Sequence, residues 1–240
     1  MKLSGNKILI TGGASGIGLG LAERFMEEGN TVIICGRRQT MLDAVSAKYP
    51  AVITKMCDLS EVSECEKLFA WLEKEHSDLN VLVNNAGIQQ WMTVRDDNFM
   101  LRAKDEININ IEVPLRLTSL FLKMKSAQTV INVTSGLSFV PLAKVPVYSA
   151  TKAFFHSWTL SLRYLLKPDG IEVIELVPPA LNTDLGGKGL HDAAPPVGDF
   201  INSAFAQLKE GKDTCTFGFS EAMINAGPEE QKAAFGKLNP

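Results

Sequence analysis

Short apolar runs rich in β-branched residues alternate along this chain with longer amphipathic segments, and no other sequence feature restricts the possible folds as strongly. Such alternation is typical of strands covered on both faces, as in a parallel sheet with helical crossovers. Because these crossovers are right-handed, helices lie on both sides of the sheet. The sequence therefore predicts an α/β fold with a doubly wound parallel β-sheet and helices on both faces. The expected strands are Ile8–Ile10, Thr31–Cys35, Ala51–Met56, Val81–Val83, Val130–Thr134, Glu172–Val177 and a weaker Asp213–Phe217. The expected helices are Leu19–Glu28, Met41–Lys48, Val62–Glu75, Phe99–Lys125 and Tyr148–Leu166.

The 240 residues are expected to form a single domain, residues 1–240, because wound α/β chains of this length commonly do so. No internal repeat, low-complexity tract or charge block marks a linker. The one long stretch without a pattern is Leu185–Asp199, where glycines and prolines interrupt regular structure. Long loops of this kind often close over a ligand. We therefore expect a flexible substrate loop at about residues 185–199.

The charge balance limits the classes of partner. With 24 basic and 27 acidic side chains the formal net charge is −3, which disfavours nucleic-acid binding because that requires a basic surface. The apolar runs are far shorter than the roughly 20 residues that cross a bilayer, so no membrane helix is expected. Four separated cysteines show neither paired nor metal-ligand spacing, which predicts reduced thiols, no metal and a cytoplasmic location. These cysteines are Cys35, Cys57, Cys65 and Cys215.

A glycine-rich turn, Thr11–Gly18, directly follows the first expected strand and opens a helix. Glycines allow a tight turn and a close approach of the backbone, and the N-terminus of a helix favours a pyrophosphate. A glycine cluster alone also fits a merely flexible turn, but the strand before it and the helix after it favour the first site of a Rossmann fold. The predicted cofactor-binding residues of this turn are Gly12, Ser15, Gly16, Ile17 and Gly18.

Two arginines, Arg37 and Arg38, follow the second expected strand, where a NAD-binding site usually carries an acidic residue. Arginine binds phosphate through bidentate, charge-assisted hydrogen bonds. The pair therefore favours NADP(H) over NAD(H). The alternative is that both arginines are solvated at a helix start, in which case NAD(H) is possible.

Three further motifs stand after expected strand ends or at a helix start: Asn84–Gly87, Ser135 and Tyr148–Lys152. With the glycine-rich turn they resemble the short-chain dehydrogenase/reductase family, in the family's order and with its usual interval of 148 − 135 = 13 residues between serine and tyrosine. The resemblance runs from about residue 6 to residue 183. Within the family the chain is most similar to bacterial reductases encoded beside lipoteichoic-acid D-alanylation genes.

The residues themselves suggest the chemistry. Tyr148 and Lys152 are spaced i, i+4 on a helix, so the ammonium is expected near the phenol. A nearby cation lowers the pKa of a tyrosine from its usual value of about 10, which makes Tyr148 a plausible general acid or base. The resemblance implies hydride transfer between NADP(H) and a carbonyl or secondary alcohol. It also implies that Lys152 holds the ribose and Ser135 the substrate oxygen.

The resemblance implies a fourth catalytic residue, Asn110, which supports a proton-relay water. Asn110 and Pro114 match the family's N-x-x-x-P segment, and Asn108 is a nearby competitor. Further cofactor contacts follow from the same resemblance. They are Asp58, Leu59, Asn85, Ala86, Gly87, Tyr148, Lys152, Pro178 and Thr183. Pro179 replaces the glycine usual in the last of these motifs, which removes a backbone N–H donor.

Apolar side chains near the expected crevice predict a largely apolar substrate pocket. Its candidates are Trp91, Leu137, Phe139, Leu181 and Leu185. The alternative for Trp91 and Phe139 is burial in the core. The resemblance also implies a homodimer or homotetramer formed through the two long helices.

Two other functions remain possible from the sequence. A dinucleotide-sensing protein could use this fold without turnover, but such proteins often lose the tyrosine or the lysine, and this chain keeps both. A methyltransferase on a related sheet would explain the glycine turn but neither Tyr148 nor Lys152. The natural substrate is not predicted.

Overall fold

The seven apolar runs form one parallel sheet in the computed structural model, which describes residues 1–240. The strand order is β3-β2-β1-β4-β5-β6-β7, so all seven expected strands are confirmed, including the weak last one. The chain reverses its direction of winding between β1 and β4, and ligands of open α/β sheets bind at such a point, outside the carboxyl ends of the strands. The strands are β1 (Lys7–Thr11), β2 (Thr31–Gly36), β3 (Ile53–Met56), β4 (Val81–Asn84), β5 (Thr129–Val133), β6 (Glu172–Val177) and β7 (Thr214–Thr216).

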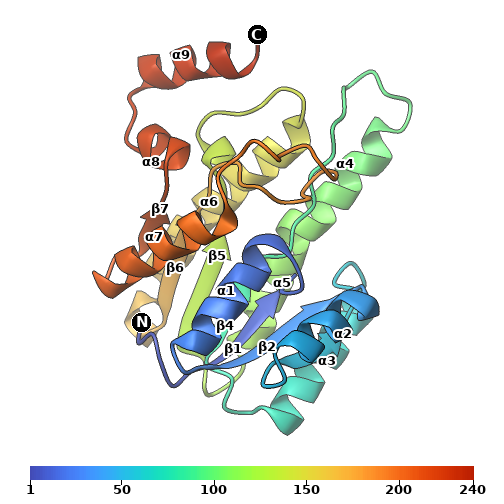
Figure 1. Cartoon of the computed structure of the whole chain (residues 1–240), viewed down its shortest axis with the longest axis vertical. Helices are drawn as coiled ribbons and strands as arrows, with labels where there is room; N and C mark the ends of the chain where they lie inside the picture. Colours follow the sequence, from blue (N-terminus) through green and yellow to red (C-terminus); the bar gives the residue numbers. More distant parts are fainter.

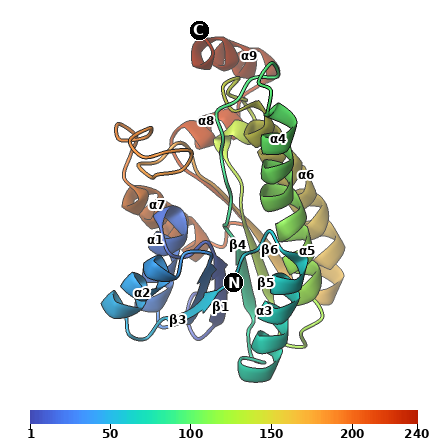
Figure 2. The ribbon, with the colours of Figure 1, turned by 90° about the vertical axis from the view of Figure 1, so that its right-hand side faces the viewer.

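Helices cover both faces of the sheet, as expected (Figure 2). Successive residues of a strand point to opposite faces, so Ile8 and Ile10 pack with α1, α2 and α7, whereas Leu9 packs with α3 and α5. This two-sided burial explains why the strands are apolar along their length. The helices are α1 (Gly16–Glu27), α2 (Gln39–Lys48), α3 (Val62–Glu75), α4 (Phe99–Ile107), α5 (Val113–Phe121), α6 (Pro146–Leu166), α7 (Val197–Lys209), α8 (Phe219–Ile224) and α9 (Pro228–Leu238).

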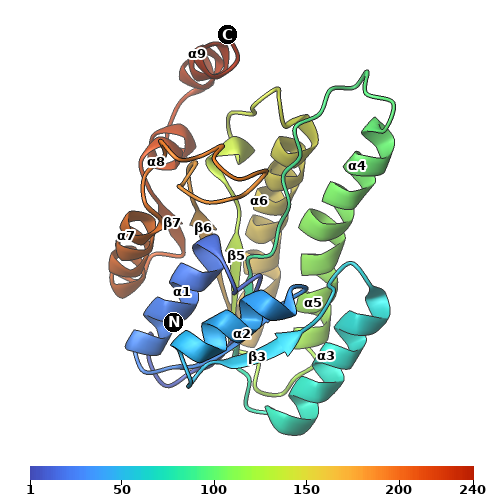
Figure 3. The same ribbon diagram turned by 45° about the vertical axis from the view of Figure 1, so that its right-hand side comes forward.

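The expected long helix Phe99–Lys125 is interrupted. A π-helical turn, Asn108–Glu112, separates α4 from α5, and the helix ends at Phe121. Pro114 lies in the first turn of α5. Because proline has no N–H and its ring crowds the carbonyl four residues earlier, a regular α-helix cannot pass through this position. Figure 3 shows α4 and α5 as two consecutive segments beside α6.

The C-terminal region differs most from expectation. Helix α7 begins at Val197, inside the predicted loop Leu185–Asp199, so the connection between β6 and α7 spans residues 178–196. The two ends of this loop are joined, since Asn182 N donates to Pro195 O at 2.9 Å. Helices α7, α8 and α9 were not predicted, and α9 has no buried residue to produce an amphipathic pattern. It lies far from the sheet, at the C-terminus (Figure 1). No helix is long and apolar enough to cross a membrane.

The packing of α1 against α7 provides a test of the core. Phe25 and Phe205 are both fully buried, with ring centroids 4.8 Å apart. Phe205→Ala should lower the free energy of unfolding by about 3–5 kcal/mol, because it leaves a cavity. The matched control Met56→Ala, at a side chain 56% exposed, should change it by less than about 0.5 kcal/mol. Urea denaturation of both variants measures the difference, and equal midpoints would contradict this account of the core.

Candidate active site

The glycine-rich turn lies between the carboxyl end of β1 and the start of α1, at the reversal point of the sheet (Figure 1). Gly12 and Gly16 have φ values of 65° and 53°, which favour glycine. A Cβ atom at Gly18 would collide with the backbone oxygen of Gly12 and lie 2.5 Å from Asn85 Nδ2. The first turn of α1 leaves backbone N–H groups without helical partners and contains no acidic residue. The turn therefore fits a pyrophosphate, and Ser15 and Ile17 lie within it as predicted.

Hydrogen bonds join this turn to the end of β4. The Thr11 hydroxyl accepts the backbone N–H groups of Asn85 and Ala86, each at 3.0 Å, and Asn85 Nδ2 donates to Thr11 O at 2.8 Å. A Cβ at Gly12 would lie 3.1 Å from Ala86 Cα. The predicted residues Asn85, Ala86 and Gly87 thus form one wall beside the glycine-rich turn.

Arg37 and Arg38 follow β2, and both are exposed. Neither forms an ion pair or a side-chain hydrogen bond, so both guanidinium groups are available to a phosphate. Asp58 lies after β3, where its Oδ1 accepts the N–H and the hydroxyl of Ser60, and Leu59 beside it is buried. These residues follow the carboxyl ends of β2 and β3, the two strands next to β1 on one side of the sheet.

Ser135, Tyr148 and Lys152 come together from two elements. Ser135 follows β5, and Tyr148 and Lys152 lie on the first turns of α6. All three are buried, with exposures of 7%, 5% and 5%. Lys152 Nζ donates to Val133 O, at the end of β5, at 2.8 Å. This bond fixes the helix of Tyr148 against the strand of Ser135.

The expected effect of Lys152 on the phenol is wrong in this structure. The ammonium lies over the tyrosine ring, 5.7 Å from its centroid, and donates its hydrogen bond elsewhere. Burial raises the pKa of Tyr148 above its usual value, a hydrogen bond with Ser135 opposes this rise, and the charge of Glu106 adds to it. Burial also lowers the pKa of Lys152 to about 8. Tyr148 is therefore a neutral phenol at physiological pH, suited to donate a proton.

Asn110 and Asn108 point in different directions. In the π-helical turn, Asn110 is 2% exposed, its Oδ1 accepts Ile88 N at 2.9 Å, and its Nδ2 donates to Thr151 Oγ1 at 3.1 Å. Asn108 instead donates to Ser60 O, away from α6. A Cβ at Gly87 would lie 3.3 Å from Asn110 Oδ1 and 3.8 Å from Lys152 Nζ, so these two side chains flank one glycine. Asn110 is thus the asparagine near the tyrosine–lysine pair.

The loop after β6 closes the other side of the glycine-rich turn. Pro178 is buried and its carbonyl accepts Gly136 N at 3.0 Å, beside Ser135. Thr183 lies against the start of α1, since its Cγ2 would be 3.4 Å from a Cβ at Gly16. Pro179 has no N–H to offer at this point. The turn therefore lies between Thr183 on one side and Asn85 on the other.

The predicted pocket residues are only partly brought to the site. Leu137 and Phe139 are half-buried beside Ser135, and Phe139 packs edge-on against His156, with centroids 4.7 Å apart. Trp91 is 42% exposed, which excludes the alternative that it is a core residue. Leu185 is half-buried in the loop. Leu181 is 3% exposed and belongs to the core beside α1 and α7, so its assignment to the pocket is wrong.

Glu106 of α4 was missed by the sequence analysis, although it is fully buried and its carboxyl accepts the backbone N–H of Gln90. The sequence feature that could have identified Glu106 is its spacing from neighbouring buried residues. Glu106 precedes the predicted Asn110 by four residues and follows the buried Ala103 by three, so all three share one helix face.

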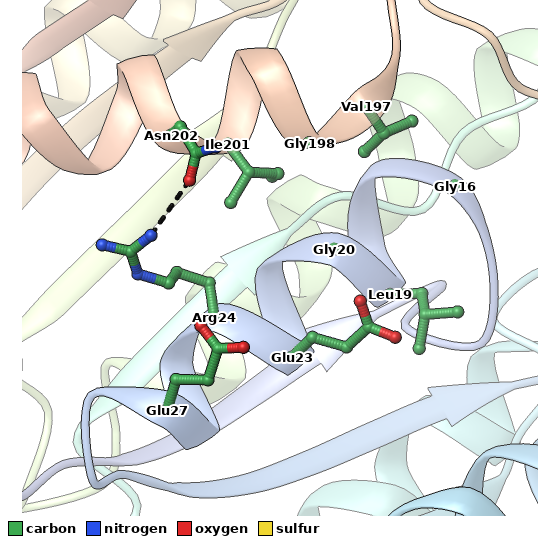
Figure 4. A pocket seen from close by; sticks show the side chains of 10 residues that line it. All are labelled: Gly16, Leu19, Gly20, Glu23, Arg24, Glu27, Val197, Gly198, Ile201 and Asn202. Carbon is green, nitrogen blue, oxygen red and sulfur yellow. Dashed lines mark hydrogen bonds between the residues drawn. The ribbon is translucent and has the colours of Figure 1, made fainter.

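A groove of about 240 Å³ between α1 and α7 borders the glycine-rich turn at Gly16 and extends away from it along the two helices (Figure 4). Its lining includes the carboxylates of Glu23 and Glu27, which disfavour a phosphate. The one arginine there, Arg24, bonds to Asn202 at 3.1 Å and to Glu28 at 3.0 Å. Close packing of Gly20 against Val197 and Ile201 gives the groove its floor.

Comparison with known proteins agrees with this geometry. A family model described as short chain dehydrogenase matches residues 6–193. This chain belongs to the short-chain dehydrogenase family. The uncharacterized oxidoreductase DltE of Bacillus subtilis is 40% identical to it over 100% of this chain and 98% of its own length. Serine 3-dehydrogenase of Agrobacterium fabrum is 32% identical, over 74% of this chain and 72% of its own.

Solved structures share the fold of this short-chain dehydrogenase. A short chain dehydrogenase from Burkholderia cenocepacia, in complex with NADP, superimposes with a TM-score of 0.85 at 24% identity, covering 99% of both chains. Membership of the family makes the protein an oxidoreductase that interconverts CH–OH and C=O groups with a nicotinamide dinucleotide.

The glycine-rich turn of this short-chain dehydrogenase gives a binding prediction. A dinucleotide at a hundredfold excess over its Kd should stabilise the unmodified protein by about 2.7 kcal/mol. Gly18→Ala should abolish this stabilisation, because the new Cβ collides with the backbone oxygen of Gly12. Gly198→Ala is the matched control, since nothing lies within 4 Å of its Cβ position. Thermal-shift titration measures both, with circular dichroism to verify folding. Undiminished stabilisation of Gly18→Ala would show that the turn is not the binding site.

Proposed function

We propose that this chain is an NADP(H)-dependent oxidoreductase that transfers a hydride between the nicotinamide and a carbonyl or secondary-alcohol substrate. One observation carries the proposal. Ser135, Tyr148, Lys152 and Asn110 meet beside the glycine-rich turn, although they come from the end of β5, the start of α6 and the π-helical turn. Bound there, the dinucleotide supplies or accepts the hydride.

In this proposal each side chain has one task during reduction. Tyr148 donates its phenolic proton to the substrate oxygen as that oxygen gains negative charge. Ser135, hydrogen-bonded to the phenol, stabilises the same oxygen. Lys152 holds the nicotinamide ribose, and its ammonium beside the ring stabilises the negative charge left on the tyrosine. In oxidation the proton moves the other way.

Asn110 supports the return of the proton. Pro114 has no N–H to donate to the carbonyl of Asn110, four residues earlier. This carbonyl is therefore available to a water molecule that passes a proton toward Lys152. The hydrogen bonds of the Asn110 side chain to Ile88 and Thr151 hold the backbone in place for this task.

The preference for NADP(H) rests on Arg37 and Arg38. Both guanidinium groups are exposed and unpaired, and no acidic residue directly follows β2. Pro178 and Thr183 would contact the nicotinamide end, and Asp58, Leu59 and residues 85–87 the adenosine end.

The substrate pocket we propose is largely apolar, with Leu137, Phe139, Trp91 and Leu185 near its opening. Residues 178–196 form the loop that would close over substrate, and three glycines between 186 and 189 allow its backbone to change conformation. The loop is tethered at Asn182 and Pro195, so any movement is confined to the residues between them.

We also propose a homodimer or homotetramer formed through α4, α5 and α6. The outer faces of α4 and α6 carry large exposed apolar side chains, which is unusual for a monomer. These are Met100, Leu101, Phe154, Leu160 and Leu165. A cytoplasmic location is proposed because all four cysteines are free thiols.

The role of Tyr148 is tested by Tyr148→Phe. Activity with NADPH in a screen of aldehydes and ketones should fall by about 10²–10⁴-fold, because the proton donor is removed, while the Kd for NADPH stays unchanged. Tyr164→Phe is the matched control, at an 80% exposed tyrosine of the same helix. Full activity of Tyr148→Phe would refute the proposed mechanism.

The cofactor preference is tested by the double variant Arg37→Gln/Arg38→Gln. Its Kd for NADPH should rise by about tenfold to a hundredfold, because charge-assisted hydrogen bonds to the 2′-phosphate are lost, whereas the Kd for NADH stays the same. Lys212→Gln, far from the site, controls for the change in net charge. Fluorescence titration gives both constants. Equal binding of NADH and NADPH by the unmodified protein would place both arginines in solvent and favour NAD(H).

A further inference from the structure

Glu106 carries a buried carboxyl group that the proposed mechanism does not use. It lies on α4 with an exposure of 0%. Its Oε1 accepts the backbone N–H of Gln90 at 2.5 Å. Asn110, four residues further along the chain, donates to Thr151 of α6 at 3.1 Å, so Glu106 lies on the side of α4 that packs against the start of α6. Its Oε2 is buried and has no hydrogen-bond partner. The carboxyl therefore connects α4 to the segment after β4, on the side that faces the helix of the tyrosine.

The charged groups around Glu106 do not neutralise it. On its own helix, the guanidinium of Arg102 bonds to Gln90 Oε1 at 3.0 Å and to Trp91 O, and lies 3.6 Å from Asp96. In the loop before α6, Lys144 lies over the Trp91 ring, 5.4 Å from its centroid. From α6 the facing titratable group is Tyr148.

The protonation states of Glu106 and Tyr148 are coupled. Burial raises the pKa of Glu106 to about 7, although the hydrogen bond from Gln90 and the charge of Arg102 oppose the rise. The charge of Glu106 in turn raises the pKa of the Tyr148 phenol. A neutral Glu106 has no such effect, because the repulsion requires a carboxylate.

We propose that Glu106 is a positioning residue whose buried carboxylate, seated against the start of α6, weakens Tyr148 as a proton donor, and whose protonation removes that restraint. The inference rests on the proposed function of Tyr148. In reduction the phenolic O–H bond breaks as a new O–H bond forms on the substrate, and the electron pair stays on the tyrosine oxygen as negative charge. A carboxylate nearby opposes this charge, whereas a carboxylic acid does not.

The sign of the pH dependence follows. Below about pH 7 Glu106 is protonated and does not weaken Tyr148 as a proton donor. Above this pH the carboxylate forms and kcat/KM falls. A like charge shifts a neighbouring pKa by about one unit, and proton transfer in the transition state transmits roughly half of this, so the expected decrease is about threefold. By microscopic reversibility, kcat/KM falls by the same factor in both directions.

The test is the ratio of kcat/KM between Glu106→Gln and the unmodified enzyme across this pH range. Glutamine keeps an acceptor for the Gln90 N–H but cannot ionise. The ratio should be near one at acidic pH and rise to about three, with its midpoint near pH 7. Asp105→Asn removes an exposed charge from the adjacent position of α4 and should give a ratio that does not depend on pH. A purely structural role of Glu106 would change the rate by a constant factor, and that result overturns the proposal.

Glu106→Met is a second variant. Like Glu106→Gln it lacks the negative charge, but its side chain otherwise differs from glutamine, so a pH-dependent ratio seen with both variants is due to the loss of the charge.

A second readout does not require turnover. The ultraviolet absorbance of the Tyr148 phenolate, isolated by subtracting Tyr148→Phe, should increase about tenfold in Glu106→Gln at one fixed alkaline pH, as expected for a pKa lowered by one unit. Unchanged absorbance refutes the coupling. Absence of turnover with any carbonyl substrate, together with this increase, would instead contradict the proposed function and leave the coupling intact.

Discussion

Burial of the central sheet on both faces is the constraint on which the rest of this structure depends. Ile8, Leu9 and Ile10 of β1 point alternately to two helix layers and are all fully buried. A strand buried in this way has no room for a solvated polar side chain along its length. Groups for ligand binding are therefore found where the strands end, and a parallel sheet brings those ends to one edge. The glycine-rich turn and Ser135 stand at this edge, and helices bring Tyr148, Lys152 and Asn110 to it.

Polar side chains that are buried near this edge are joined to one another. Asn84 donates to Asn132 and to Thr118 at 3.0 Å each, and Asn132 donates to Thr159 of α6 at 2.9 Å. With the bond from Lys152 to the end of β5, these contacts tie β4, β5 and α6 together beneath the site. Hydrogen bonds of this kind hold positions because a buried polar group is costly to leave unpaired.

The same exclusion of water sets the protonation states. Burial raises the pKa of Tyr148 and of Glu106 and lowers that of Lys152, so each group is shifted toward its neutral form. The physical reason is common to all three, since a charge loses more solvation than a neutral group when it leaves water. The chemistry of this site thus depends on which neighbouring groups restore part of that solvation.

Local pattern alone determined much of this protein. The seven strands, the glycine-rich turn and the helical spacing of Tyr148 and Lys152 depend on residues close together in sequence, so they were predicted correctly. The expected helix Phe99–Lys125 runs through Pro114, although proline acts within one helical turn and could have indicated the break there. Helix α9 and the core position of Leu181 were not predicted, because neither depends on a local apolar pattern.

Tertiary structure decided what depends on neighbours far along the chain. The sequence placed Lys152 one turn from Tyr148, but the carbonyl of Val133 takes its hydrogen bond, and burial raises the pKa of the phenol. It offered Asn108 and Asn110 as candidates, and the packing of α4 against the segment after β4 and against α6 selected between them. Glu106 acquired its environment in the same way. Periodicity specifies which face of a helix is buried, but only the folded chain specifies which groups meet there and how much water remains.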